Sequence, residues 1–177
     1  MRNKHLYFLF FVMSSKLILA QTASIGIQSG WDIFIFDRGN SLGTNLNLSF
    51  NYSFNKLFEI EVKSGLSIAE DFTGFDFGGY LKLYPIEFPI YVIGGMKIHP
   101  NIGHSGNGQG VRDDVYYLPT LGLGYKIKVS KTFITYEIIY QKPYPNGLNW
   151  FYSVDQYYYS DDFYGVIGFN FIFSWEL

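Results

Sequence analysis

Two histidines, a serine and two aspartates stand close together in one glycine-rich segment of this 177-residue chain. His99, His104 and Ser105 are followed by Asp113 and Asp114. A histidine beside a serine can supply the base and the nucleophile of acyl transfer, with an acid to orient the imidazole. The same side chains offer nitrogen and oxygen ligands for a metal ion. Catalytic or metal chemistry would therefore be sought in this segment first.

Neither chemistry is the one that we expect. The spacing of His99, His104, Asp113 and Asp114 matches no established metal site, and ordering a glycine-rich loop would cost conformational entropy. Residues 103–110 lack the lysine and the strand-to-helix context of a phosphate-binding loop. The chain has no cysteine, which excludes disulfides and thiolate metal sites. We expect no catalytic residue, no metal and no cofactor.

A second group of residues is suited to recognition rather than to catalysis. Its members are aromatic and crowd one long connection near the C-terminus: Tyr144, Trp150, Phe151, Tyr152, Tyr157, Tyr158 and Tyr159. Tyrosine and tryptophan give a large contact area at a low entropic cost. The alternative is that the last two strands extend outward as a hairpin, where these rings pack on one another or join an aromatic girdle.

The N-terminus resembles a secretory signal peptide. Arg2 and Lys4 precede an apolar run from Leu6 to Met13, and the segment ending at Ala20 predicts cleavage there. An uncharged run of about 8 residues is too short for a membrane-spanning helix, which needs roughly 20. Removing residues 1–20 changes the formal charge from −2 to −5, which argues against nucleic-acid binding. We expect one mature domain, residues 21–177.

The elements that carry these residues are β-strands. Along 42–54, leucine and aromatic residues alternate with asparagine, serine and glycine, and a strand places such alternate residues on opposite faces. The pattern recurs and predicts eight strands, at 24–36, 42–54, 57–68, 75–84, 89–98, 115–128, 132–142 and 162–176. The predicted fold is all-β, an eight-stranded antiparallel up-and-down transmembrane β-barrel.

The connections alternate in length. Short ones are expected at 55–56, 85–88 and 129–131, whereas 99–114 and 143–161 are long. Outer-membrane barrels have short periplasmic turns and longer external loops, and an even number of strands returns both termini to the periplasm. Pro119 lies inside the sixth predicted strand, where we expect a bulge or a late start to regular pairing.

The polar face of these strands would fill the lumen. It carries five acids and five bases: Asp32, Glu59, Glu61, Lys63, Asp76, Lys82, Lys97, Lys126, Lys128 and Glu137. A barrel of eight strands has an interior just wide enough for side chains to fill. Buried charges there must pair to avoid a large desolvation cost. The balance of charge predicts a neutralised plug and not an ion-selective pore.

A soluble barrel of lipocalin type also has eight alternating strands, with its apolar face turned inward. The membrane alternative is favoured by a glycine-rich polar face, by the strand lengths and by aromatic residues near the predicted strand ends. These aromatic residues, which could form girdles, are Tyr52, Phe54, Phe58, Tyr84, Phe88, Tyr116, Tyr117 and Trp175.

The strand that ends the chain carries a family resemblance. The aromatic residues Phe169, Phe171, Phe173 and Trp175 alternate with residues that are polar except for Ile172, up to Leu177. The segment resembles the C-terminal signal of small outer-membrane β-barrels of the OmpA/OmpX type. That family's usual last residue is phenylalanine, from which Leu177 departs. The resemblance implies a location in the bacterial outer membrane, contact with outer-membrane lipid, and insertion by the barrel-assembly machinery.

We therefore expect a non-enzymatic outer-membrane barrel with a side-chain-filled lumen, which has a structural role or meets an extracellular ligand or surface partner through its loops. One alternative is a small passive pore, and another is a secreted lipocalin-like binder. A third is an enzyme that modifies lipid A, because eight-stranded deacylases also pair a histidine with a serine. Those enzymes separate the two residues by one position on a strand, whereas His104 and Ser105 are adjacent.

Overall fold

The structure, a computed structural model, describes residues 22–36, 39–69, 72–85, 89–102, 115–144, 148–154 and 157–177. For residues 148–154 and 157–162 the structure describes the backbone only. The expected signal peptide, residues 1–20, lies outside the described residues. In the part of the chain that is described, no helix is long and apolar enough to cross a membrane.

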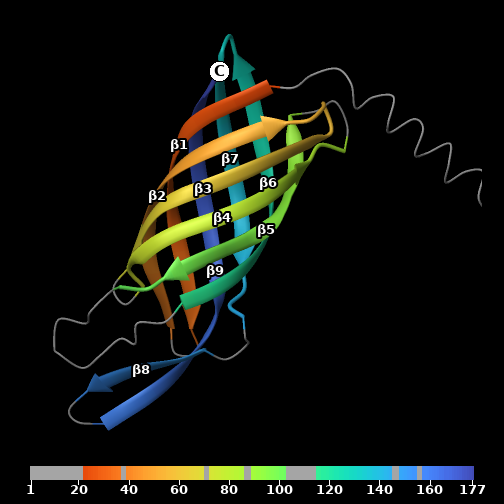
Figure 1. Ribbon diagram of the computed structural model, residues 1–177. Helices are drawn as coiled ribbons and strands as arrows, with labels where there is room; N and C mark the ends of the chain where they lie inside the picture. The colour runs from red at the N-terminus through yellow and green to blue at the C-terminus, as the bar shows by residue number, and fades with distance from the viewer. Residues whose placement is uncertain are drawn as a thin grey trace, which may run out of the picture.

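Eight antiparallel strands close into a barrel (Figure 1). They are β1 (Thr22–Phe36), β2 (Gly39–Ser53), β3 (Phe58–Ile68), β4 (Gly74–Leu83), β5 (Ile90–Pro100), β6 (Val115–Val129), β7 (Thr132–Gln141) and β9 (Tyr157–Glu176). Each strand from β1 to β7 pairs with the next, β7 pairs with β9, and β9 returns to β1 along most of its length. Closure satisfies the backbone on every side, so the barrel wall has no open edge. The all-β, up-and-down barrel predicted from the alternation is confirmed.

One strand was not expected. β8 (Leu148–Val154) lies in the last long connection and pairs with the first part of β9, from Tyr157 to Phe163. The two form a hairpin that projects from the barrel (Figure 1). The last strand therefore begins five residues before the predicted position, and the hairpin joins β8 to β9 instead of β7 to β9.

The two ends of the barrel differ. The β2–β3 turn at 54–57, the end of β4, the start of β5 and the β6–β7 turn at 130–131 gather with the C-terminus at one end, called the turn end here, and β8 projects at the opposite, loop end (Figure 1). The tight β6–β7 turn places Ser130 in the left-handed region, with φ of 60°. In the β2–β3 turn, the Asn55 side chain accepts hydrogen bonds from the backbone amides of Leu57 and Phe58, at 2.7 and 2.9 Å.

Pro119 does not produce the predicted bulge. β5 and β6 stay in register through the pair Met96 and Pro119. The carbonyl of Pro119 faces the β7 side, where it accepts a bond of 3.0 Å from the amide of Lys142, one residue beyond the end of β7. The proline nitrogen faces the same side, opposite Lys142 just beyond the end of β7, so no carbonyl of β5 loses a donor.

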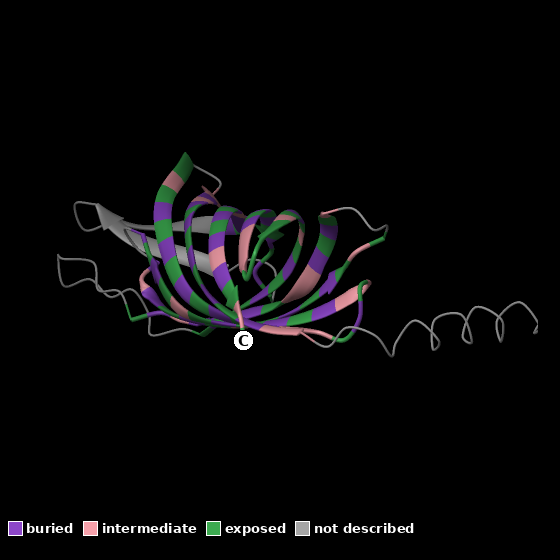
Figure 2. Cartoon of the chain, turned by 90° about the horizontal axis from the view of Figure 1, so that it is seen from above, coloured by how far each residue is buried: buried purple, intermediate pink, exposed green. Residues whose placement is uncertain are grey.

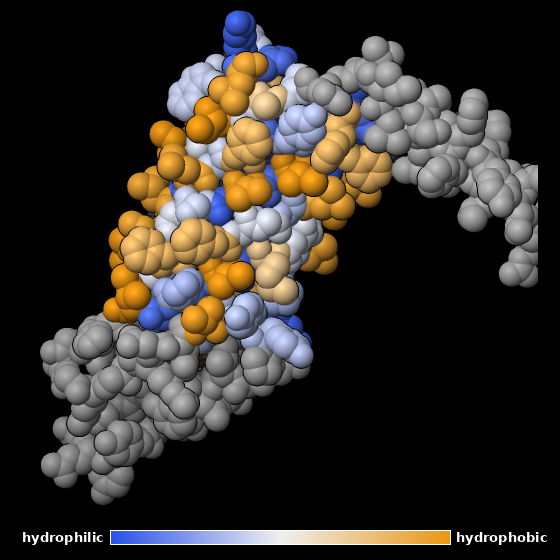
Figure 3. All heavy atoms as spheres, viewed as in Figure 1, coloured by the Kyte–Doolittle hydropathy of each residue, from blue (hydrophilic) through white to orange (hydrophobic). Residues whose placement is uncertain are grey.

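Apolar residues face outward and polar residues face inward along the strands. On β2, Leu42 and Leu48 are 69% and 61% exposed, whereas Asn47 between them is 5% exposed. Buried and exposed positions alternate in the same way around the barrel (Figure 2), and apolar side chains gather on its outer surface (Figure 3). This arrangement is the reverse of a lipocalin-type barrel, which the structure therefore disfavours.

Two of the predicted girdle residues, Tyr84 and Tyr116, lie inside the barrel, and so does Phe163, which the alternation along the last strand predicts to face outward. Phe163 continues the parity of Phe169 and Phe171, yet it is buried inside because the pairing of β1 with β9 shifts register beside it. Tyr116 is also buried in the lumen, and Tyr84 packs on an interior cluster that contains Tyr80. Each of these residues lies on the inward face of its strand or just beyond that strand's end. Proximity to a strand end was therefore a poor guide to the girdle.

Candidate functional site

The lumen contains a cluster of paired charges near the turn end, named the inner ion cluster here. Its members are Glu59, Glu61, Lys63, Lys82, Lys126 and Glu137, which come from β3, β4, β6 and β7. Lys63 lies between two carboxylates, and Lys82 lies among three, the third being Glu59 at 3.5 Å. The Nζ atom of Lys63 is 2.7 Å from Glu137 and 3.1 Å from Glu61, and that of Lys82 is 3.1 and 3.0 Å from the same two residues. Lys126 pairs with Glu59 at 2.6 Å.

Aromatic and hydroxyl groups complete this cluster. Tyr91 donates its hydroxyl to Oε1 of Glu137 at 2.5 Å, and Ser53 donates to Glu59 at 2.9 Å. The ammonium group of Lys82 lies 4.9 Å from the ring centre of Tyr91. The three acids and three lysines are nearly all excluded from solvent, which is tolerable only because their charges balance and each carboxylate lies in an ion pair.

A layer of amide side chains lies beside Asp32 in the middle of the lumen. Asn45 donates from Nδ2 to Asp32 at 3.0 Å and to Asn170 at 3.2 Å. Because this nitrogen must face the carboxylate, Oδ1 of Asn45 turns away and accepts from Gln28 at 3.1 Å and from Asn47 at 3.3 Å. All five side chains are buried. They join β1, β2 and β9 across the inside of the barrel.

A second charged group lies closer to the loop end. Asp76 accepts a hydrogen bond from the hydroxyl of Ser67, lies 2.7 Å from Nδ1 of His99, and is 3.5 Å from Nζ of Lys97. His99 is fully buried on β5 and stacks on the ring of Phe72, with ring centres 3.7 Å apart. The sequence placed His99 in a loop with the metal candidates, whereas the structure places it inside the barrel.

This arrangement does not form the base and nucleophile pair of an acyl-transfer site. Ser67 and His99 both bond to Asp76, so the serine hydroxyl is directed to the carboxylate and not to the imidazole. Within the described residues, no group of three or more histidine, aspartate or glutamate side chains could hold a metal ion. The candidates His104, Ser105, Asp113 and Asp114 lie outside the described residues.

Apolar side chains close the lumen at the loop end, in a layer named the aromatic cap here. It comprises Phe34, Ala69, Phe72, Tyr116, Leu118, Phe163 and Val166, with Phe36 packed against it. Phe72 enters from the connection between β3 and β4, and its ring centre lies 4.8 Å from that of Phe34. Sequence reasoning missed the cap, although Phe34 lies two residues after Asp32 and therefore shares its inward face.

A small cavity remains among the described residues of the lumen. A cavity of about 20 Å³ lies among Gln28, Asn47, Lys97, Gln141 and Asn170, which is room for about one water molecule. The inner ion cluster, the amide layer and the aromatic cap thus fill successive levels of the barrel.

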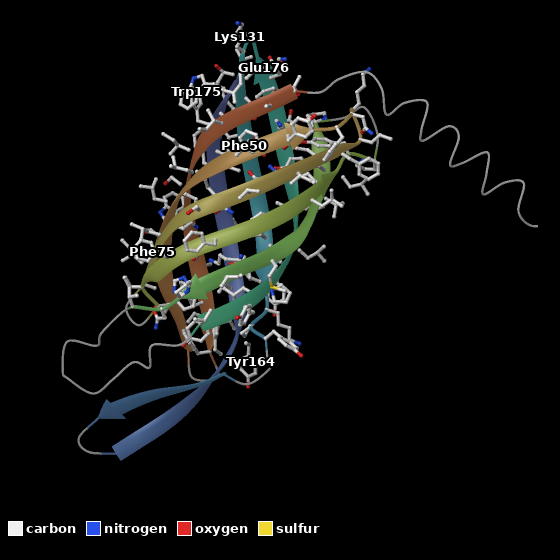
Figure 4. The ribbon with its side chains drawn as sticks, in the orientation of Figure 1. Phe50, Phe75, Lys131, Tyr164, Trp175 and Glu176 are labelled. Carbon is white, nitrogen blue, oxygen red and sulfur yellow. The ribbon has the colours of Figure 1, made fainter. Side chains whose placement is uncertain are left out.

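The ten predicted lumen charges divide into two groups. The structure buries eight of them, and Lys126 is nearly buried, with 13% of its side chain exposed. Lys128 is the exception and corrects the prediction. Its side chain is 50% exposed and pairs with Glu176 at 2.6 Å, because it lies beside the β6–β7 turn where the barrel opens to solvent. Figure 4 shows Glu176 and Lys131 at this end.

The predicted recognition residues lie on and beside the projecting hairpin. Tyr144 is exposed and forms an isolated bridge with Tyr117 of β6. The strand register pairs Trp150 with Asp161, Tyr152 with Tyr159 and Val154 with Tyr157, which places Trp150, Tyr152, Tyr157 and Tyr159 on one hairpin face. Phe151 and Tyr158 occupy the opposite face, at positions that pair with Ser160 and Ser153.

Comparisons with known proteins bear on the fold. No protein-family model matches the chain, and no curated protein matches it. The solved structure of neisserial surface protein A superposes with a TM-score of 0.60 at 10% identity, covering 88% of this chain and 97% of that chain. This chain has the fold of a small outer-membrane barrel. Outer membrane protein OprG from Pseudomonas aeruginosa gives 0.53 at 12% identity, over 89% and 97% of the two chains. The N-terminal β-barrel domain of Pseudomonas aeruginosa OprF gives 0.51 at 13% identity, over 89% and 100%.

Proposed function

We propose that the protein is a non-enzymatic β-barrel that spans the bacterial outer membrane and acts as a structural or surface-interaction protein. One observation carries the proposal, namely that apolar side chains cover the outside of the barrel while paired charges fill its inside. A soluble protein rarely exposes a continuous apolar surface of this extent, since water favours the opposite arrangement. Lipid around the barrel removes the conflict.

The height of the apolar surface supports this environment. On β2 the outward side chains run from Leu42 to Tyr52, which is about 34 Å along a strand at the usual rise per residue. With a strand tilt of about 40°, this length corresponds to about 26 Å along the barrel axis. Outer-membrane barrels have an apolar band about 25 Å tall. Trp175 lies near the turn end and Tyr164 near the loop end, at the two levels where interfacial aromatic residues are expected (Figure 4).

The filled lumen supports a structural role over a transport role. An open path would have to pass the aromatic cap, the amide layer and the inner ion cluster, and the buried cavity beside Asn47 has room for about one water molecule. Displacing Lys63 or Lys82 from its carboxylates would leave charges buried without partners. We expect the barrel to be closed to ions.

Interaction at the cell surface would fall to the loop end. The β8–β9 hairpin projects there, and its register gathers Trp150, Tyr152, Tyr157 and Tyr159 on one face. A two-stranded hairpin is marginally stable by itself in water. Tyrosine and tryptophan at these register positions would give a surface partner a large contact area.

Measurements of membrane behaviour, of conductance and of lipid A deacylation test the proposal. The protein should fractionate with outer membranes, require detergent for purification, and migrate differently on a gel before and after boiling. In a planar bilayer it should give no sustained open current, whereas a steady conductance would favour a passive pore. Recovery as a detergent-free soluble protein would refute the membrane assignment. Release of acyl chains from lipid A by the purified protein would refute the non-enzymatic assignment.

A further inference from the structure

The outer surface of the barrel is not uniform, because a crevice of about 410 Å³ lies across β1, β9 and β7. Its apolar lining comes from Trp31, Tyr136, Ile138, Phe169 and Phe171, with Ser29 among them. The volume falls in the range of small-molecule sites, which is about 300–1,000 Å³. An indentation of this size in a lipid-facing wall can hold part of one lipid molecule.

The strand register explains why the crevice forms there. Ser29 of β1 pairs with Phe171 of β9, which pairs with Tyr136 of β7, so these three outward residues form one row across the wall. Ser29 is much smaller than its neighbours in the row. The rings of Tyr136 and Phe171 meet edge to face, with centres 5.3 Å apart, and Ser29 leaves the space beside them open.

The next row toward the loop end bounds the space on that side. Trp31, Phe169 and Ile138 pair across the same three strands. The crevice is therefore enclosed by large side chains in two successive rows and is open to the membrane.

A polar patch lies on the same side of the barrel, toward the loop end. Three outward residues alternate with buried ones at and just beyond the end of β7: Tyr140, Lys142 and Tyr144. They are flanked by Tyr117 of β6 and Tyr164 of β9. Two hydrogen bonds hold these residues in place. The Tyr144 amide donates to the Tyr117 carbonyl at 2.8 Å, and the Tyr140 hydroxyl donates to the Tyr164 carbonyl at 3.2 Å.

Toward the loop end of β2, β3 and β4, the described outward residues are mainly apolar, with Asn40 on β2 as a polar exception. Leu42 on β2, Ile68 on β3 and Phe75 on β4 are all apolar. The polar patch places hydroxyl donors and an ammonium group above the crevice, at the level where lipid headgroups are expected.

The crevice and the patch are separated by the depth of one leaflet. Tyr136 and Lys142 are six residues apart, about 20 Å along an extended chain. At a tilt of about 40° this becomes about 15 Å along the barrel axis, which is half of a hydrocarbon core of about 30 Å. A lipid whose headgroup rests at Lys142 would place the end of its acyl chain in the crevice.

We propose that this side of the barrel binds one phosphorylated glycolipid of the outer leaflet. Lys142 pairs with the phosphate, the tyrosine hydroxyls hydrogen-bond the headgroup, and an acyl chain lies along β7 and β9 into the crevice beside Ser29. Cations attract phosphate by charge, and apolar crevices hold chains by burial. The inference rests on the proposed location in the outer membrane and adds to it a specific lipid and a specific face.

Native mass spectrometry of the full mature protein tests this site. The barrel is taken from vesicles of phosphatidylethanolamine that contain a small fraction of lipid A, and the lipids retained on it are counted. We expect the wild type to retain lipid A in preference to phosphatidylethanolamine. Lys142→Gln should weaken retention by about tenfold, the equivalent of one charge-assisted hydrogen bond. Ser29→Phe should reduce it by filling the crevice.

The matched control is Lys131→Gln, which removes a lysine at the turn end, where the proposal predicts no effect (Figure 4). Lipid A without its phosphates should bind wild type and Lys142→Gln equally. Equal retention of lipid A by wild type, Lys142→Gln and Ser29→Phe would overturn the site. All variants are first checked for the change in gel mobility on boiling. A wild type that lacks that change would instead refute the proposed barrel in the membrane.

Discussion

Glu137 is the residue on which the inner ion cluster most depends, and replacing it by glutamine gives the sharpest test of the filled lumen. Its carboxylate lies 2.7 Å from Lys63 and 3.1 Å from Lys82, and it accepts the hydroxyl of Tyr91 at 2.5 Å. Glutamine has nearly the same size but no charge. The cluster would then hold three lysines against Glu59 and Glu61, so one buried positive charge would have no counterion.

The expected cost follows from that uncompensated charge. Removing one partner of a buried ion pair costs about 3–5 kcal/mol, whereas a surface pair contributes about 1 kcal/mol or less. Glu137→Gln should therefore lower the free energy of unfolding by several times as much as Lys128→Gln, which removes a half-exposed lysine paired with Glu176. The measurement is urea unfolding of the reconstituted barrel, followed by tryptophan fluorescence and by gel mobility.

A double variant separates lost charge balance from lost packing. Lys63→Met together with Glu137→Gln leaves two lysines and two glutamates in the cluster, and should recover a large part of the lost stability. A loss for Glu137→Gln no larger than that of the Lys128 control would refute the reasoning. The reasoning would also be refuted if the double variant lost more free energy of unfolding than the two single variants lose together.

Four further predictions concern the cap, the lipid face, the hairpin and the leader. Phe72→Ala should cost about 3–5 kcal/mol in the same assay because Phe72 is fully buried, and the outward-facing Phe75→Ala should cost clearly less. Leu46→Arg, on the outer surface of β2, should cost about 2–4 kcal/mol in vesicles, and a variant as stable as wild type would contradict lipid contact. Deleting residues 148–160 should leave the gel shift on boiling unchanged, because β9 makes its closing pairs with β1 and β7 from Phe163 onward. The mass of the mature protein should correspond to a chain that begins at Gln21, and an uncleaved mass would refute the signal peptide.

The sequence predicted the barrel well because one strong physical pattern governs it. Alternation with a period of two recurs in every strand, and it assigns each residue to a face without knowledge of its neighbours. The face predicted for a residue is wrong where the strand pairing shifts register and the regular alternation is interrupted. Phe163 follows a register shift, and an alternating pattern extrapolated through the shift puts it outside. β8 was missed because a short strand in a long aromatic loop resembles a recognition segment as much as a hairpin.

The contents of the lumen were predictable as a set but not as pairs. Parity places Lys63 and Glu137 inside, yet they are 74 residues apart in sequence, and Lys126 is 67 residues from Glu59. Which charges meet depends on strand register and side-chain length across the barrel, and neither is encoded locally. The aromatic cap depends further on how the β3–β4 connection turns Phe72 inward. The Lys128 error has a similar origin, because parity gives a face and does not say where the barrel ends.

The features with a proposed role gather on one side of an otherwise regular barrel. β9 contributes Phe169 and Phe171 to the crevice, Tyr164 to the polar patch, and residues 157–163 to the projecting hairpin. β7 supplies the other wall of the crevice and ends where Tyr140 begins the patch. Beyond that point, β8 takes the place of β7 as the pairing partner of β9. A continuous strand therefore connects the lipid-facing crevice to the hairpin, so a glycolipid bound along β9 would lie directly beneath the hairpin that we propose as the site of contact with a surface partner.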